Sequence, residues 1–319
     1  MLNKKILITG ASGYIAGAFM DRFENREDIE LSGVARRKLT RKNYKSIDLS
    51  MPFQLDFNPD VVIHAAARTS PWGTEAEFKK QNIDTTKNVV SFCESHGLPK
   101  LIYLSSSSVF YQNKHQMNLT EDSQIGPDFV NQYAATKYAG EKLVRAYTGQ
   151  HVILRPRAVF GPKDTVLFPR ILKAAEKGSL PMFKAEGQPA IGDLIYIDVL
   201  CDYILSAALR DDIQGEYNLT NNEPVPIQDF LLSVLEQLEL PKPQKTVNIA
   251  LAMRAAWITE LLYKIFRLPW EPPITRFGVS VFAYSKTFDV SKMLKDLGPP
   301  SVSIEEGVAA FVKWWKING

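Results

Sequence analysis

The sequence contains few cysteines and histidines, and this scarcity excludes two common kinds of site. Only two cysteines occur in 319 residues, Cys93 and Cys201, and they form neither a CxxC motif nor a disulfide framework. The four histidines lack the paired spacing of a zinc site. We therefore expect no bound metal and no disulfide.

An excess of charge of one sign is also missing. The chain has 38 basic and 35 acidic residues, a net charge of +3, and no basic stripe interleaved with aromatic residues. Proteins that bind nucleic acid normally carry such a stripe or a strong positive charge. The balance predicts a protein whose partners are small molecules and not nucleic acids.

Long uninterrupted apolar runs are absent. The longest apolar stretch, residues 249–266, has roughly the length of a membrane helix but contains Arg254, Glu260 and Lys264, which are costly in hydrocarbon. The N-terminal sequence leads directly into a short apolar strand and has no signal-peptide pattern. We expect no membrane span and a cytoplasmic location.

Short apolar runs and helix-patterned segments alternate in the first half of the chain. The pattern predicts strands at 5–9, 32–35, 61–65, 101–105, 152–155 and 215–219, and helices at 15–24, 75–96, 131–147 and 198–210. This alternation is typical of βαβ units, in which each crossover helix packs on a parallel sheet. After residue 219 prolines punctuate a helical, irregular region.

We therefore predict an α/β protein with a Rossmann-type doubly wound parallel sheet and a smaller, mostly helical C-terminal substrate lobe. The dinucleotide-binding domain is expected at residues 1–162 and about 194–222, and the substrate lobe at about 163–193 and 223–319. In such sheets ligands bind at the carboxyl ends of the strands. A lobe over that edge would close the site.

The segment TGASGYIAG, residues 9–17, follows the first strand and opens the first helix. Gly10 allows the tight turn, and Gly13 lets the backbone approach a pyrophosphate at the positive end of the helix. The third small position of the motif is Ala16, which dinucleotide-binding sites tolerate. At the start of a βαβ chain, this loop predicts a dinucleotide site.

The end of the second strand indicates which dinucleotide is bound. An NAD site usually places an acid there to bind the ribose 2′-hydroxyl. This chain has Arg36 and Arg37 instead, and guanidinium groups suit a 2′-phosphate. NADP(H) is therefore favoured, with NAD(H) as the alternative. Asp48, further on, is placed to meet the adenine edge or to cap its own loop.

The sequence NQYAATKYAGEK, residues 131–142, contains the candidate catalytic pair. Tyr133 and Lys137 are four residues apart, so both lie on one helical face. A phenol has an ordinary pKa near 10, and an adjacent ammonium would lower the pKa of Tyr133 and favour proton transfer. Tyr138 and Lys142 repeat the spacing five residues later, but both pairs cannot face one cofactor.

Four serines end the strand in LIYLSSSSVF, residues 101–110. A hydroxyl at this edge of the sheet can hydrogen-bond a substrate carbonyl and stabilise the developing alkoxide. Ser106 is our first choice for this role and Ser107 the second. A serine-rich turn without catalytic function is the alternative interpretation.

Together these motifs resemble the extended short-chain dehydrogenase/reductase superfamily. VVIHAAA at 61–67, LRPRAVFGP at 154–162, IYIDV at 195–199 and GEYNLTNNEP at 215–224 also match, so the resemblance covers about three-quarters of the chain. It implies that Ser106 orients the substrate, Tyr133 is the acid/base and Lys137 binds the nicotinamide ribose. The residues then expected to bind the cofactor are Gly10, Ser12, Gly13, Tyr14, Ile15, Arg36, Arg37, Asp48, Leu49, Ala65, Ala66, Ala67, Asn82, Ser105, Tyr133, Lys137 and Pro156.

Departures from the family pattern indicate which subgroup of the superfamily this chain resembles. Nucleotide-sugar dehydratases carry Asp-Glu where this chain has Ser107 and Ser108, and epimerases usually have Asn where it has Arg157 or Ala158. The diphosphate-binding arginine before IYIDV is also missing. In contrast, AARTSPWG at 66–73, PPITR at 272–276 and residues 288–308 are similar to the 3β-hydroxysteroid dehydrogenase/isomerase branch, which includes reductases of β-keto acids.

The sequence thus predicts an NADP(H)-dependent oxidoreductase that interconverts a ketone and a secondary alcohol on a hydrophobic, sterol-like or β-keto acid-like substrate. The stretch Trp257–Trp270 is expected to form an apolar substrate wall, or else an ordinary core or dimer helix. Arg68 and Arg157 are candidates for binding a substrate carboxylate, although we expect each to form a structural ion pair.

The resemblance implies a homodimer formed through the helices at 75–96 and 131–147. A nucleotide-sugar epimerase or dehydratase with tightly bound NAD, and a non-catalytic dinucleotide sensor, are the alternative functions.

Overall fold

Seven parallel strands form the centre of the fold, in the order β12-β7-β5-β4-β1-β2-β3. The computed structural model describes residues 3–184, 188–268 and 270–319, so the parts of the predicted ranges that fall on residues 1–2, 185–187 and 269 lie outside it. Register is regular: Ile6 of β1 pairs with Leu31 on one side and Val61 on the other. The strands are β1 (Lys4–Thr9), β2 (Ile29–Ala35), β3 (Tyr44–Ser46), β4 (Val61–His64), β5 (Lys100–Leu104), β7 (His151–Pro156) and β12 (Gly215–Leu219).

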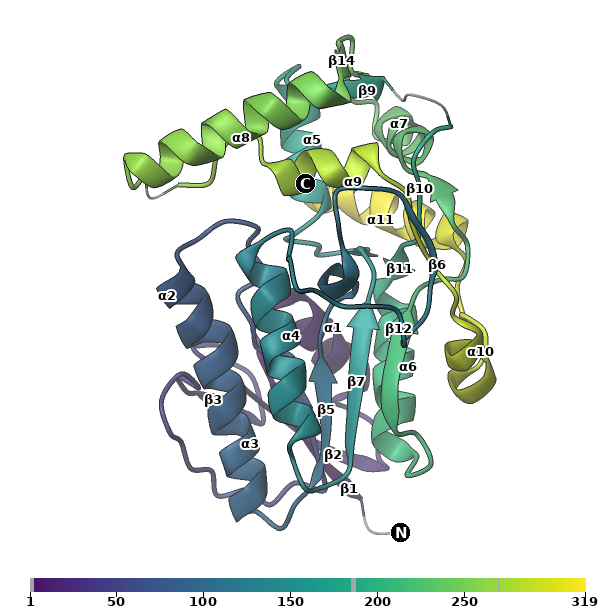
Figure 1. Ribbon diagram of the computed structural model, residues 1–319. Helices are drawn as coiled ribbons and strands as arrows, with labels where there is room; N and C mark the ends of the chain where they lie inside the picture. The colour runs from purple at the N-terminus through teal and green to yellow at the C-terminus, as the bar shows by residue number, and fades with distance from the viewer. Residues whose placement is uncertain (1–2, 185–187, 269) are drawn as a thin grey trace.

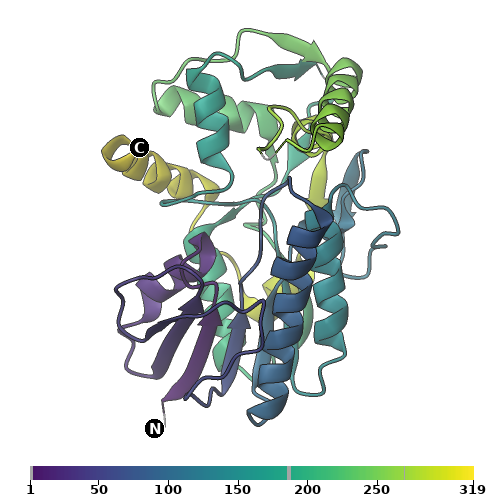
Figure 2. The ribbon, with the colours of Figure 1, turned by 90° about the vertical axis from the view of Figure 1, so that its left-hand side faces the viewer.

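Side chains alternate between the two faces of this sheet, and both faces are covered, which is why inner strands such as β4 and β5 are buried along their whole length. Ile6 and Ile8 face the layer that contains Phe19, whereas Leu7 faces the layer that contains Phe92. Figures 1 and 2 show helices covering both faces, as a doubly wound fold requires. These helices are α1 (Tyr14–Phe23) and α6 (Ile197–Leu209) on one face, and α3 (Thr85–Ser95) and α4 (Gln132–Arg145) on the other.

The helix predicted at 75–96 is three segments instead of one. It consists of α2 (Glu75–Phe78), a π-helical segment η1 (Lys79–Asp84) and α3. Thr74 begins α2 with a capping box to Glu77. The wide turn holds the buried Asn82, whose backbone oxygen accepts a hydrogen bond from the Thr86 hydroxyl at 2.6 Å. The hydrophobic periodicity of the sequence could not reveal the π-helical segment, because a π-bulge shifts the helical pattern by only one residue.

A second lobe lies over the carboxyl ends of the strands, at the top of Figure 1. Its helices are α5 (Phe168–Glu176), α7 (Ile227–Gln237), α8 (Ile249–Ile265), α9 (Arg276–Ala283) and α11 (Ile304–Asn318). Short strands, which the sequence did not reveal, accompany them. They are β9 (Met182–Lys184) paired with β14 (Thr246–Asn248), β8 (Val159–Phe160) paired with β11 (Ile195–Tyr196), and the sheet of β13 (Val225–Pro226), β10 (Ile191–Gly192), β15 (Lys286–Phe288) and β6 (Gln116–Leu119).

Two elements lie across the predicted domain boundary. Strand β6 belongs to the first 162 residues but pairs with β15 of the lobe. Conversely, α10 (Ser291–Leu297) lies in the range predicted for the lobe but packs against β12 and α6. The two parts of the chain are therefore interlocked, which fixes the lobe over the sheet edge. Of the helices in the described ranges, α8 included, none has both the length and the apolarity needed to cross a membrane.

Candidate active site

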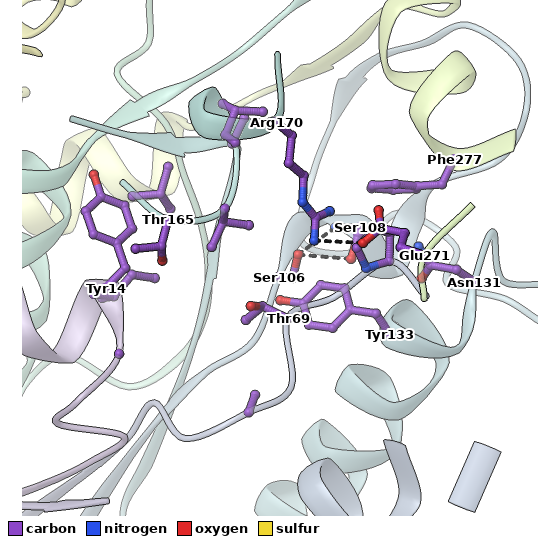
Figure 3. A pocket seen from close by; sticks show the side chains of 18 of the residues that line it. Tyr14, Thr69, Ser106, Ser108, Asn131, Tyr133, Thr165, Arg170, Glu271 and Phe277 are labelled. Carbon is purple, nitrogen blue, oxygen red and sulfur yellow. Dashed lines mark hydrogen bonds and ion pairs between the residues drawn. The ribbon is translucent and has the colours of Figure 1, made fainter. Parts of the chain in front are cut away.

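A cavity of about 920 Å³ lies between the carboxyl edge of the large sheet and the lobe. It includes the turn after β1 and the segment after β4, the two neighbouring strands at which the chain direction across the sheet reverses. This is the position where open α/β sheets bind ligands. The remaining walls come from the end of β5, the start of α4, the end of β7, helix α5 and helix α9, and Figure 3 shows part of them.

The glycine-rich loop forms the floor at one end. Gly10 has a φ of +73°, and a Cβ there would lie 2.9 Å from the Ala66 backbone, so only glycine fits. Helix α1 begins at Tyr14 after Gly13, and no side chain caps its first amides. Gly13, Tyr14 and Ile15 all line the cavity. This end therefore fits the pyrophosphate of a dinucleotide, because uncapped amides at a helix N-terminus bind anions.

Two arginines lie beside this loop. An Arg37 Nη donates to the backbone oxygen of Ser12 at 2.6 Å, and an Arg36 Nη donates to Gln81 Oε1 at 3.2 Å. Both line the cavity at the end of β2, and both are exposed. Asp48 also lines the cavity, and its Oδ1 caps the amide of Ser50 at 3.0 Å, which lowers the pKa of its carboxyl. The two roles suggested for Asp48 are thus compatible.

Tyr133 lies in the first turn of α4 and points into the cavity beside Ser106 (Figure 3). Burial raises the pKa of Tyr133 to about 12, and the Ser106 hydroxyl acts in the opposite direction. Ser106 Oγ accepts hydrogen bonds from Ser108 Oγ at 2.9 Å and from the Ser108 amide at 3.2 Å. The Ser107 hydroxyl is bonded instead to Tyr111 Oη, at 3.1 Å. Ser106 is therefore the serine that faces the phenol.

Lys137 lies one turn further along α4, behind the cavity wall. Its Nζ lies 4.3 Å from the centre of the Tyr103 ring, and burial lowers its pKa to about 7. Burial dominates the pKa shifts of both groups, and the lowering of the Tyr133 pKa by Lys137 stays a prediction. The second pair does not compete: neither Tyr138 nor Lys142 lines the cavity, and their side chains stack on each other.

Buried polar groups support this floor. His64 is bonded through Nδ1 to Thr9 Oγ1 at 2.8 Å and through Nε2 to Thr86 Oγ1 at 3.0 Å, and burial lowers its pKa to about 3. The Ser105 hydroxyl donates to the buried Glu141, which also pairs with Arg155. These contacts hold β1, β4, β5 and α4 in fixed positions beneath the cavity.

The side chain of Asn82 also lies behind the cavity wall and connects two of the segments that form it. Its Oδ1 accepts from the Arg68 amide at 2.7 Å, and its Nδ2 donates to Thr136 Oγ1 at 2.9 Å. The side chain therefore ties the segment after β4 to helix α4 and does not line the cavity. Of the residues predicted to bind the cofactor, Asn82 and Lys137 lie outside the lining, and the other fifteen belong to it.

The other end of the cavity is mainly apolar. Its lining includes Leu167, Ile171 and Ala174 on or beside α5, and Phe277 and Phe282 on α9. An ion pair of 3.0 Å between Arg170 and Glu271 links the two walls (Figure 3).

The prediction that Trp257–Trp270 forms the apolar wall is wrong for the described residues of that stretch. They are absent from the lining, and Trp257 and Phe266 are exposed. The adjacent segment 271–282 takes that place. The sequence could not separate them, because both are apolar and aromatic.

The two candidate carboxylate-binding arginines differ. Arg68 forms an ion pair with Glu77 at 3.7 Å, as expected. Arg157 lines the cavity, and no carboxylate of the described chain lies within 4 Å of it, so the expected ion pair is absent. Asn131 and Tyr111, which sequence reasoning did not select, also line the cavity. Asn131 carried a usable signal, since Asn before a helix is a strong N-cap.

Comparison with known proteins agrees with this geometry. Residues 6–220 match the model of the NAD dependent epimerase/dehydratase family. A 2-alkyl-3-oxoalkanoate reductase of Stenotrophomonas maltophilia is 29% identical over 95% of this chain and 97% of its own length. The decarboxylating sterol-4-alpha-carboxylate 3-dehydrogenase of Mus musculus is 28% identical over 79% of this chain and 73% of its own.

The fold is shared with solved structures as well. The Bordetella bronchiseptica enzyme WbmH, determined in complex with NAD+, superposes with a TM-score of 0.75 over 99% of this chain and 100% of its own, at 19% identity. Sheet order, glycine-rich loop and family match all agree. The chain belongs to the NAD dependent epimerase/dehydratase family, within the extended short-chain dehydrogenase/reductase superfamily.

Proposed function

We propose that this protein is an NADP(H)-dependent oxidoreductase that interconverts a ketone and a secondary alcohol on a hydrophobic small molecule. The observation that carries the proposal is the position of Ser106 and Tyr133. Both line one cavity that has an anion-binding loop at one end and an apolar wall at the other. A carbonyl group at these hydroxyls would have the dinucleotide on one side and its own alkyl skeleton on the other.

When bound, the nicotinamide would supply or accept a hydride at the carbonyl carbon. Ser106 would hydrogen-bond the carbonyl oxygen and hold it towards Tyr133. In the reducing direction Tyr133 would donate its phenolic proton to that oxygen, and a pKa raised to about 12 keeps the phenol protonated at neutral pH. The family resemblance implies that Lys137, one turn further along α4, would bind the ribose hydroxyls. The apolar wall would exclude water from the reacting groups.

The preference for NADP(H) rests on Arg36 and Arg37. These are the charged residues that line the cavity at the end of β2. Arg37 already bridges to the glycine-rich loop through Ser12, so a 2′-phosphate bound there would meet a guanidinium held in place. Bidentate contacts of this kind favour phosphate over a bare hydroxyl.

The apolar wall favours a substrate with an alkyl or ring skeleton over a nucleotide sugar. Relatives named for a 2-alkyl-3-oxoalkanoate and for a sterol-4-alpha-carboxylate act on molecules of that kind. A diphosphate and a uridine would instead need polar partners, and the wall formed by α5 and α9 offers few. The cytoplasmic location and the homodimer stay predictions.

The test is a cofactor-oxidation screen with NADPH and NADH in parallel. Purified protein is offered medium- and long-chain 3-oxo acids, sterol-like ketones and UDP-glucose. We expect NADPH consumption with the first two classes only, at a rate about a thousandfold lower for the Tyr133→Phe variant. Conversion of UDP-glucose without net change in the dinucleotide would overturn the proposal in favour of an epimerase.

A further inference from the structure

Arg157 is a buried cation whose Nε has no partner among the residues that the structure describes. It lies at the end of β7, is 5% exposed and lines the cavity. Its Nε is buried and has no hydrogen-bond partner, and within the described chain no carboxylate approaches its guanidinium closer than 4 Å. The guanidinium carbon stands 5.2 Å from the centre of the Tyr111 ring. An unpaired buried charge is costly, so its presence in a cavity indicates an anionic ligand.

Two charged groups lie near Arg157, Lys286 and Asp193, and no ion pair of 4 Å or less joins Arg157 to an acid in the described chain. Lys286, which is also buried, has its Nζ 5.7 Å from the centre of the same Tyr111 ring, and burial together with Arg157 lowers its pKa to about 7. The nearby acid is Asp193, whose Oδ2 accepts a hydrogen bond from the Phe288 amide at 2.9 Å. Burial raises the pKa of Asp193 to about 6, and Arg157 acts in the opposite direction. Because Asp193 lies beyond ion-pair distance and the Arg157 Nε has no partner among the described groups, the guanidinium still has donors available for an anionic ligand.

The other arginine of the cavity is different. Arg170 is bound to Glu271 at 3.0 Å, and its side chain is 45% exposed. Its charge is already balanced and solvated, so it has little need of a ligand. The contrast singles out Arg157 as the arginine of the cavity that is available to a ligand.

Arg157 is one aromatic ring away from the catalytic hydroxyls. The Tyr111 ring that it covers has its Oη bonded to Ser107 Oγ at 3.1 Å, next to Ser106. Tyr111 also acts electrostatically on Tyr133, so the two phenols are close. An anion on Arg157 would thus lie a short distance from a carbonyl oxygen held by Ser106 and Tyr133.

Resting on the proposed function, we propose that Arg157 forms a carboxylate subsite that selects 3-oxo and 3-hydroxy acids. In such acids the carboxylate is attached to the carbon next to the reacting one, so it reaches the arginine while the oxygen faces Tyr133. The names of two relatives share this pattern: a 2-alkyl-3-oxoalkanoate, and a sterol 4-carboxylate that is oxidised at carbon 3. Acid recognition is therefore built into the end of β7, and the apolar wall receives the rest of the molecule.

The experiment compares one acid with its own ester. The wild-type protein oxidises 3-hydroxydecanoate and methyl 3-hydroxydecanoate with NADP+, and kcat/KM is measured for each. We expect the acid to be favoured about 10- to 100-fold, the range of a hydrogen bond to a charged group. Arg157→Gln brings the ratio near one, mainly through KM of the acid, and Arg157→Lys retains part of it. Lys173→Gln removes a positive charge from an exposed position of α5 outside the lining and leaves the ratio unchanged.

Equal wild-type rates on acid and ester would overturn the subsite, as would an Arg157→Gln variant that keeps the preference. The wild-type comparison needs no variant, so it decides even if Arg157→Gln does not fold. Calorimetric titration of the NADP(H)-loaded protein with decanoate and decanol separates the two proposals. If neither substrate turns over but decanoate binds through Arg157, the proposed function fails and the subsite stands. UDP-glucose binding that is lost with Arg157→Gln would instead make it a diphosphate site.

Discussion

The two ends of the cavity are built in different ways. At the cofactor end the lining is mostly backbone and small side chains, such as Gly10, Gly13 and Ala66, held at the edge of a parallel sheet. At the substrate end the lining consists of larger side chains from α5 and α9, about one hundred residues apart in the chain. The cofactor end is shaped by the backbone, so its geometry suits one class of ligand. The substrate end is shaped by side chains, so substitutions there can change the specificity without disturbing the sheet.

Tyr133 stands where the two ends meet, and its loss should have the largest effect. We expect Tyr133→Phe to lower kcat about a thousandfold, because it removes the proton donor while the ring still packs. The affinity for NADPH should hardly change. Steady-state kinetics and fluorescence titration of NADPH measure the two quantities. Tyr138→Phe is the control, since that phenol lies outside the lining, and substantial turnover by Tyr133→Phe would remove the assignment.

His64 tests whether the cofactor end depends on a neutral buried network. Its pKa is lowered to about 3 in the folded protein, against an ordinary value near 6.5. The unfolded chain therefore binds more protons between these values, and stability is lost as the pH falls from 6.5 towards 3. Integration gives a loss of about 3 kcal/mol between pH 7 and pH 4 from this group.

The measurement is urea unfolding of wild type and His64→Gln at both pH values. We expect the variant to be less stable at pH 7, because it loses bonds to Thr9 and Thr86, but to lose less on acidification. His151→Gln, at the half-exposed start of β7, is the control and should follow the wild type. Parallel acid losses in wild type and His64→Gln would show that His64 carries no part of the effect.

Arg36 and Arg37 test the nucleotide preference, the one feature of the cofactor end that depends on side-chain charge. The double variant Arg36→Ala, Arg37→Ala should weaken NADPH binding about 10- to 100-fold and leave NADH binding nearly unchanged. Lys38→Ala is the matched control, because Lys38 follows in sequence and does not line the cavity. An equal loss for both dinucleotides would point to a structural role for the pair.

The same division explains what the sequence could predict. The loop at 9–17, the strand edges and the helix with Tyr133 obey local rules of spacing, so fifteen of the seventeen expected cofactor residues line the cavity. Asn82 lies behind the cavity wall because the π-helical segment η1 changes the direction of its side chain. The apolar wall is formed by segment 271–282, and not by the exposed stretch after residue 256 that the sequence suggested. Which of two apolar segments faces a cavity is decided by tertiary packing, which leaves no period in the sequence.

Ala174 tests whether helix α5 limits the length of substrate that the apolar end can hold. Ala174 lines the cavity on α5, opposite the aromatic side chains of α9. Phenylalanine at this position would occupy space that the far end of a long substrate needs, while Ser106 and Tyr133 remain accessible. Because a buried methylene contributes about 0.8 kcal/mol, the loss of room for two methylenes should lower kcat/KM for the longest 3-hydroxy acids about tenfold. Short acids should react as before, so a chain-length series measured for Ala174→Phe should show a break.

Glu176→Phe adds the same ring to an exposed position of α5 and should leave the series unchanged. An equal loss at every chain length would mean that α5 does not contact the alkyl chain and that the substrate lies elsewhere in the cavity.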